Sequence, residues 1–195
     1  MTRFAGKVSV VTGAGSGIGR EMALQLAREG SAVLCADIDE QSAQATAARV
    51  EELGAKSIGL GLDVTDSEAV KASLDRAVKD LGGLHVLMNN AGVGSGFGWA
   101  RTTDVNLSGV YYGLIHAAPM MAAAGGGAIV NTASVAGLHG LVRAPAFDVL
   151  DPAHMEGVSA YVAAKHGVVG LTKQFAVSFG RAKVRVNAVC PGYIV

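Results

Sequence analysis

Charged residues are scarce in this sequence of 195 residues. Asp, Glu, Lys and Arg together make up 16% of it, the formal net charge is zero, and the Lys and Arg residues form no cluster. Proteins whose main partner is nucleic acid normally carry a basic patch, because contacts to the phosphate backbone supply much of their affinity. The sequence therefore argues against nucleic acid as the main partner.

Cysteine is also scarce, and its two copies have neither pairing nor metal-ligand spacing. Cys35 and Cys190 both lie in apolar runs, which is typical of buried thiols in the reducing cytosol. No long apolar region precedes Lys7, as it would in a signal peptide. Residues 105–142 lack charge, but Pro119 and three successive glycines interrupt them, which favours a buried helix and strand over a membrane span. We therefore expect a cytoplasmic protein with no membrane partner.

Apolar residues, by contrast, make up 50% of the chain, in short runs that alternate with helical patterns. The runs predict strands at 7–13, 31–37, 56–63, 84–90, 128–134 and 184–190. Helices are predicted at 17–30, at 40–53, from the capping-box sequence TDSE (65–68) to a point before Gly82, near 100–124 and at 159–179. This alternation is typical of an α/β fold with a doubly wound parallel sheet (Rossmann fold), here a single domain over residues 1–195. The strands would end at one edge, where a ligand crevice forms.

The turn after the first predicted strand reads TGAGSGIG, residues 12–19. It lacks the strict G-x-G-x-x-G spacing of dinucleotide-binding turns, but its glycines can serve the same purposes. Gly13 would let the chain leave the strand, Gly17 would let the backbone approach a pyrophosphate, and Gly19 would let the helix pack on the sheet. The free N–H groups of the helix would then face the phosphates. Taken alone, the turn is also compatible with tight packing and no ligand.

An acidic residue at the end of the second predicted strand adds to this pattern. Asp37 follows Gly17 by 20 residues, and an acid at this spacing typically binds the hydroxyls of a ribose. Its charge would repel a 2′-phosphate, and the sequence shows no Arg or Lys nearby to attract one. NAD is therefore favoured over NADP. Asp39 is interpreted as the N-cap of the next helix.

Several further motifs complete a family pattern. They are DV (63–64), NNAG (89–92), VNLSG (105–109), Ser134 in TASVAG, YVAAK (161–165) and PGYIV (191–195). With the glycine-rich turn, they resemble the classical short-chain dehydrogenase/reductase family over essentially the whole chain. No single motif is decisive, since a Tyr and a Lys four residues apart are common on ordinary helix surfaces. Their order and their placement on the expected elements carry the resemblance.

The resemblance implies four catalytic residues. Tyr161 and Lys165 lie at i and i+4 of a helix and hence on one face. A neighbouring ammonium favours the phenolate, so that Tyr161 could take a hydroxyl proton while hydride leaves for the nicotinamide. Ser134 would bind the substrate oxygen, and Asn106 would hold a water that relays protons to Lys165.

The resemblance also implies the cofactor contacts. Asp63 and Val64 would meet the adenine, the segment from Asn90 to Gly92 would run beside the adenosine ribose, and Ile194 would meet the nicotinamide amide. We interpret Asn89 as a structural residue of the sheet, and the five histidines lack metal-ligand spacing. The full set of expected NAD-binding residues is Gly13, Ser16, Gly17, Ile18, Gly19, Asp37, Asp63, Val64, Asn90, Ala91, Gly92, Tyr161, Lys165, Pro191, Gly192 and Ile194.

The sequence departs from the family pattern in three places. Between Gly92 and Asn106 it is shorter, by roughly two or three helical turns. Between Ser134 and Tyr161 it is longer, with an unusual loop predicted at about 139–158. After PGYIV the family continues with a substrate loop, a helix and a last strand, so we interpret the chain as C-terminally incomplete, lacking the usual last helix and strand.

The leading hypothesis is an NAD-dependent oxidoreductase that interconverts a secondary alcohol and a ketone, with a small-molecule alcohol or carbonyl as substrate. The alternative is a non-catalytic NAD-binding fragment or an interaction subunit. A sugar-nucleotide epimerase or dehydratase is less favoured, because such enzymes normally need a larger C-terminal domain. By resemblance, a homo-oligomer is expected through the two long helices.

Overall fold

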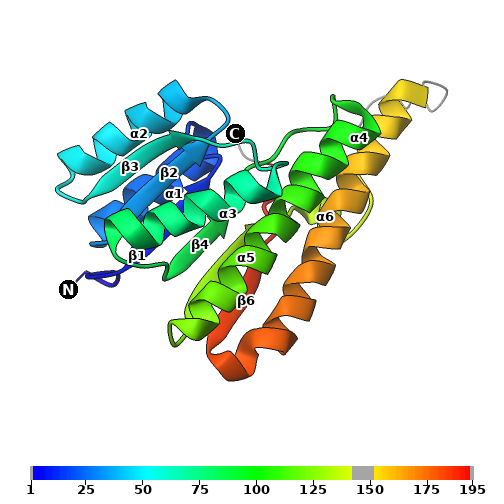
Figure 1. The fold of residues 1–195 in the computed structure, drawn as a ribbon. Coiled ribbons are helices and arrows are strands. Elements are labelled where there is room, and N and C mark those ends of the chain that lie inside the picture. The colour runs from blue at the N-terminus through cyan, green and yellow to red at the C-terminus, as the bar shows by residue number, and fades with distance from the viewer. Residues whose placement is uncertain (1, 142–151, 194–195) are drawn as a thin grey trace.

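The computed structural model describes residues 2–141 and 152–193 and has the predicted α/β architecture (Figure 1). Six strands form one sheet in the order β3-β2-β1-β4-β5-β6, and every neighbouring pair is parallel. The strands are β1 (Val8–Thr12), β2 (Ala32–Asp37), β3 (Ser57–Gly61), β4 (Val86–Asn89), β5 (Gly127–Thr132) and β6 (Val184–Val189). Because the strands are parallel, their carboxyl ends meet at one edge of the sheet.

Helices connect the strands, as the alternating pattern predicts. They are α1 (Gly17–Arg28), α2 (Glu40–Glu52), α3 (Ser67–Arg76), α4 (Gly98–Thr103), α5 (Gly109–Ala123) and α6 (Pro152–Phe179). The π-helical turn η1 (Ala77–Leu81) continues α3, and a second one, η2 (Asp104–Ser108), joins α4 to α5. There are also two short 3₁₀ helices, η3 (Val135–Gly137) and η4 (Gly180–Ala182). No helix in the described ranges is long and apolar enough to cross a bilayer.

The sheet separates two hydrophobic cores, because successive side chains of a strand point to opposite faces. Val10 of β1 packs with Leu74 of α3 and Leu114 of α5 on one face. The next residue, Val11, packs with Leu24 of α1 on the other face, together with residues of α2. Burial on both faces explains why the strands read as nearly continuous apolar runs.

Two predicted boundaries are wrong. Helix α3 begins at Ser67 and its N-cap is Asp66, whose carboxylate accepts bonds from the backbone N–H groups of Glu68 and Ala69. The expected cap, Thr65, instead donates its hydroxyl to Asp63. Helix α6 begins at Pro152, so residues 152–158 belong to a helix and not to the loop predicted at 139–158. Proline suits this position, because the first turn of a helix leaves its N–H groups unpaired. Residues 142–151 of that loop lie outside the described residues.

Candidate active site

A hollow of about 440 Å³ opens at the carboxyl edge of the sheet. It brings together residues from the turn after β1, the segment after β4, the end of β5, helix α6 and the segment after β6. All four predicted catalytic residues line it, with most of the predicted cofactor-binding residues: Gly13, Ser16, Gly17, Ile18, Gly19, Asn90, Gly92, Asn106, Ser134, Tyr161, Lys165, Pro191 and Gly192. Pockets of this size commonly hold small ligands.

The other predicted residues lie beside the hollow or beyond it. Asp37 ends β2 next to the glycine-rich turn. Asp63 and Val64 follow β3, and Ala91 lies between two lining residues. Ile194 lies outside the described residues.

Lys165 is a buried cation in the wall of the hollow. Its side chain is 4% exposed, and Nζ donates a hydrogen bond of 2.8 Å to the carbonyl oxygen of Thr132, at the end of β5. Burial lowers the pKa of its ammonium from 10.5 to about 8, because a low-dielectric surrounding disfavours the charged form. Nζ also lies 5.6 Å from the centre of the Tyr161 ring, one helical turn earlier. The pair is therefore on one face of α6, as its spacing predicts.

Ser134 is held at the start of the short helix η3. Its Oγ accepts a bond of 3.1 Å from the backbone N–H of Ala136, so the hydroxyl proton remains available to another acceptor. The backbone N–H of Val135 donates to the carbonyl oxygen of Pro191 at 2.9 Å. This bond ties the ends of β5 and β6 together and places Ser134 and Gly192 in the same wall.

Asn106 is fully buried in the π-helical turn η2. Its Oδ1 accepts from the backbone N–H of Val93 at 3.0 Å, and its Nδ2 donates to the carbonyl oxygen of Val93 at 2.8 Å. A Cβ on Gly92 would lie 2.6 Å from that Oδ1, which is too close for any side chain. The Asn106 side chain thus fastens the segment after β4, and its expected part in holding a water stays a prediction.

The glycine-rich turn has both a packed side and an open side. A Cβ on Gly19 would collide with the Gly13 carbonyl oxygen, whereas a Cβ on Gly17 would meet no atom within 4 Å. Asn90 braces the turn by donating from Nδ2 to the carbonyl oxygens of Thr12 and Gly13, at 3.2 and 3.4 Å. Close packing explains Gly19, and the open space at Gly17 fits a dinucleotide whose phosphates approach the backbone.

Two acidic residues near the expected adenosine site, Asp39 and Asp63, are held by local hydrogen bonds. Asp39 is the N-cap of α2, as predicted, and accepts from the backbone N–H of Ser42. Asp63 accepts from the backbone N–H and the hydroxyl of Thr65, at 2.9 and 2.8 Å. These bonds, and then the charge of Arg101 at 3.7 Å, lower the pKa of the Asp63 carboxyl. No sequence pattern indicates Arg101, since an ion pair between distant segments depends on the fold.

A buried polar chain beneath the site was also missed. Asn89 of β4 donates to Oδ1 of Asn131 on β5, and Asn131 donates to the hydroxyl of Thr172 on α6, both at 2.9 Å. All three side chains are buried. The structural role expected for Asn89 is confirmed, and these bonds join the strands to the helix that carries Tyr161 and Lys165.

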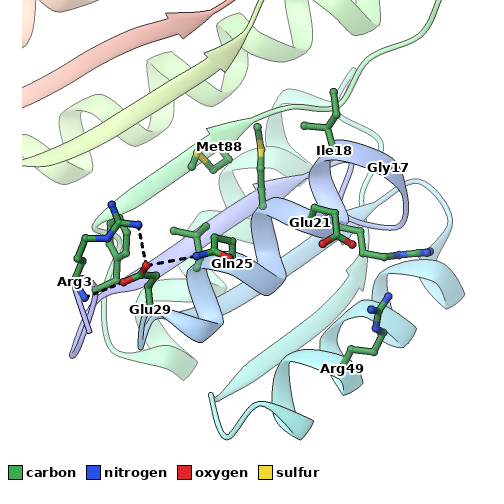
Figure 2. A pocket seen from close by; sticks show the side chains of 12 residues that line it. Arg3, Gly17, Ile18, Glu21, Gln25, Glu29, Arg49 and Met88 are labelled. Carbon is green, nitrogen blue, oxygen red and sulfur yellow. Dashed lines mark hydrogen bonds and ion pairs between the residues drawn. The ribbon is translucent and has the colours of Figure 1, made fainter. Parts of the chain in front are cut away.

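A second hollow, of about 760 Å³, lies on the other side of the glycine-rich turn, along α1 (Figure 2). It shares Gly17 and Ile18 with the first hollow. Its rim includes an ion pair between Arg3 and Glu29, and Met88 of β4 also lines it. Tyr161, Lys165 and Ser134 line the smaller hollow, which is therefore the candidate active site. Within residues 2–141 and 152–193, no three His, Cys, Asp or Glu side chains are grouped to hold a metal ion.

Comparisons with known proteins agree with this geometry. A family model described as enoyl-(acyl carrier protein) reductase matches residues 13–195. Cyclohexanol dehydrogenase of Acinetobacter sp. (strain SE19) is 41% identical over an alignment of 201 positions, which covers 98% of this chain and 74% of that protein. Cis-4-hydroxycyclohexanecarboxylate dehydrogenase of Sinomonas cyclohexanicum is 39% identical over 199 residues, covering 97% and 74%.

A solved structure, carveol dehydrogenase from Mycobacterium avium in complex with NAD, is 34% identical, with a TM-score of 0.85 over 98% of this chain and 72% of that one. These matches extend over nearly the whole chain, and they agree with the strand order and with the hollow at the carboxyl edge of the sheet. The chain belongs to the short-chain dehydrogenase/reductase family and is an oxidoreductase of the kind that uses a nicotinamide dinucleotide.

Proposed function

We propose that the protein is an NAD-dependent dehydrogenase that interconverts a secondary alcohol and a ketone. The meeting of Tyr161, Lys165 and Ser134 in one hollow beside the glycine-rich turn carries this proposal. Two relatives are named for alcohols on a six-membered carbon ring, which supports an alicyclic secondary alcohol as the substrate class. The relatives reported above are named as dehydrogenases, so the non-catalytic alternative has no support among them.

The cofactor would lie along the carboxyl edge of the sheet. Its phosphates would face the backbone from Ser16 to Gly19, and its adenosine would lie near Asp37, Asp63 and Val64. The segment from Asn90 to Gly92 would flank the adenosine ribose, and Pro191 and Gly192 would flank the nicotinamide. Asp37 favours NAD, because a carboxylate binds ribose hydroxyls and repels a 2′-phosphate. Bound NAD supplies the acceptor for the hydride that leaves the carbinol carbon.

Residues of the chain would bind the substrate oxygen and transfer its hydroxyl proton. The Ser134 hydroxyl would donate a hydrogen bond to the substrate oxygen and so orient it, while its Oγ accepts from the N–H of Ala136. Tyr161 Oη takes the hydroxyl proton of the alcohol, or returns it to the ketone in the reverse direction. Lys165 favours the phenolate of Tyr161, and its burial strengthens that effect because little water screens the charge. Thr132 holds the ammonium in place through its carbonyl oxygen.

We also propose that residues 1–195 act as one domain, in a cytoplasmic homo-oligomer. Helices α5 and α6 would form the contact between subunits, because both expose large apolar side chains. Tyr111 on α5 is 41% exposed and Val177 on α6 is 81% exposed. Neither residue lines the proposed active site.

Substitution of Tyr161→Phe tests the function. We expect calorimetric titration to show NAD affinity within about threefold of the parent, while oxidation of cyclohexanol falls at least about 100-fold, because general acid–base catalysis is worth that much. Tyr111→Phe removes the same hydroxyl group at the proposed subunit contact, away from the hollow, and is the matched control that should keep full activity. Undiminished oxidation by Tyr161→Phe would refute the mechanism, whereas NAD binding without turnover in the parent would favour the non-catalytic alternative.

A further inference from the structure

The 93–99 segment leads from the stretch after β4 into α4 and lies against α6. Two of its residues, Val93 and Gly94, line the candidate active site, and α4 packs along α6 near the N-terminus of that helix (Figure 1). The carboxylate of Glu156, on α6, accepts a hydrogen bond of 2.9 Å from the backbone N–H of Trp99. One end of the segment thus borders the active site, and the other end is fastened to α6.

Gly157 lets the middle of this segment come closer to α6 than any other residue would allow. Gly157 is buried, and a Cβ at this position would collide with the carbonyl oxygen of Ser95. Tyr161 follows Gly157 by four residues, so the two lie on one face of α6, about 6 Å apart along the helix axis. The backbone of Ser95 therefore forms a wall one helical turn from the side chain of Tyr161.

We propose that Gly157 is a positioning residue that limits the size of the substrate, because it lets the 93–99 segment lie close to Tyr161. The inference rests on the function proposed above, in which Tyr161 takes the proton of the substrate hydroxyl. A substrate bound in this way must fit its carbon ring into the space that the segment leaves beside Tyr161. Since protein interiors are close-packed, a shift of this backbone changes which rings fit.

The surroundings of the segment determine how it responds to a side chain at residue 157. Asn106 holds both backbone groups of Val93, so the start of the segment stays in place while its middle is displaced. In Gly157→Ala, the Ser95 carbonyl oxygen has to move away from α6 by roughly 1–2 Å to reach an ordinary contact distance. The space beside Tyr161 then widens.

Steady-state oxidation of cyclohexanol and of cyclooctanol by Gly157→Ala tests the inference, because the larger ring has two more methylenes. We expect the ratio of kcat/KM for cyclooctanol to that for cyclohexanol to rise at least about tenfold over the parent, since a methylene in a pocket is worth about that factor or more. The change should lie in KM, because the groups that transfer the proton keep their places. Calorimetric titration should show unchanged affinity for NAD, whose expected contacts precede the 93–99 segment.

Gly170→Ala is the matched control. Gly170 is an exposed glycine of the same helix, and a Cβ there would meet no atom within 4 Å. This variant should keep the ratio of the parent. Glu156→Ala loosens the other end of the segment and should raise the ratio as well, whereas Glu156→Gln keeps an acceptor for the Trp99 N–H and should restore the ratio of the parent.

The outcomes separate this inference from the proposed function. If Gly157→Ala folds, as circular dichroism would show, and keeps the ratio of an active parent, the inference is refuted. If Gly157→Ala does not fold, an unchanged ratio in the exposed variant Glu156→Ala overturns it. An equal rise in Gly170→Ala would also overturn it, because the effect would then come from the helix and not from the segment. A parent that binds NAD but oxidises neither alcohol would refute the proposed function itself.

Discussion

Replacing Lys165 with methionine is expected to abolish turnover and, at neutral pH, to stabilise the fold. Lys165 as a whole is 4% exposed. Its ammonium has the Thr132 carbonyl oxygen as acceptor and forms no ion pair with a carboxylate in the part of the chain that the structure describes. Burial of a charge without a counter-charge costs stability. The buried ammonium therefore does not stabilise the fold, which is consistent with the proposed effect of Lys165 on Tyr161.

The pKa of Lys165 gives the size of this cost. Burial lowers it from 10.5 to about 8, and this difference corresponds to about 3 kcal/mol of destabilisation below pH 8. The unfolded chain binds the proton more tightly, so the stability of the parent rises as pH increases from 8 to 10.5. Loss of the bond to Thr132 offsets about 1 kcal/mol of the gain. Lys165→Met should thus be more stable than the parent by about 2 kcal/mol at pH 7.

Urea denaturation of the two proteins at pH 7 and at pH 10 measures this effect. Other titrating groups are common to both proteins and cancel in the difference. We expect the difference in unfolding free energy to shrink by about 2–3 kcal/mol between the two pH values. A difference that does not change with pH, or a variant less stable than the parent at pH 7, would refute the argument that Lys165 is a costly buried charge.

Two further predictions concern groups that hold the structure together. Asn106→Ala should lower the unfolding free energy by about 2–4 kcal/mol, because both backbone groups of Val93 lose their partner. Asn187→Ala, at an exposed position of β6, is the control. A loss below about 1 kcal/mol in Asn106→Ala would contradict the view that the Asn106 side chain holds the segment after β4. His85 accepts from the Val8 N–H at 3.0 Å, and burial followed by the charge of Lys7 lowers its pKa below 6.5. The stability of the parent should therefore fall as pH drops through 6.5, and His85→Asn should lack this fall; parallel pH profiles would disprove the prediction.

The fold was predictable because each strand and helix has its own local signal. The run KVSVVTG contains β1, and the alternation of apolar runs with helical patterns fixes a parallel sheet. The position of Asp37 at the end of β2 follows from that pattern. Tyr161 and Lys165 share a helix face because of their spacing. These features depend on residues close together in the sequence.

The features that were missed depend on contacts between distant segments. Nothing in the spacing indicates that Asn106 bonds to Val93 or that Asn131 joins Asn89 to Thr172. The cap of α3 is a different case, because the bonds involved are local: the Thr65 hydroxyl bonds to Asp63, two residues away, and Asp66 takes the cap position that the capping-box pattern gives to Thr65. Local patterns thus identify the residues of the site, whereas the hydrogen bonds that position them emerge only from tertiary structure.

Transfer of deuterium tests the central claim most directly. Cyclohexanol labelled with deuterium on the carbinol carbon would be incubated with the protein and NAD, and the NADH isolated for mass spectrometry. An oxidoreductase that acts by hydride transfer predicts NADH with one deuterium for each ketone formed. Ketone formed together with unlabelled NADH, or NAD binding with no ketone from any secondary alcohol, would contradict the account.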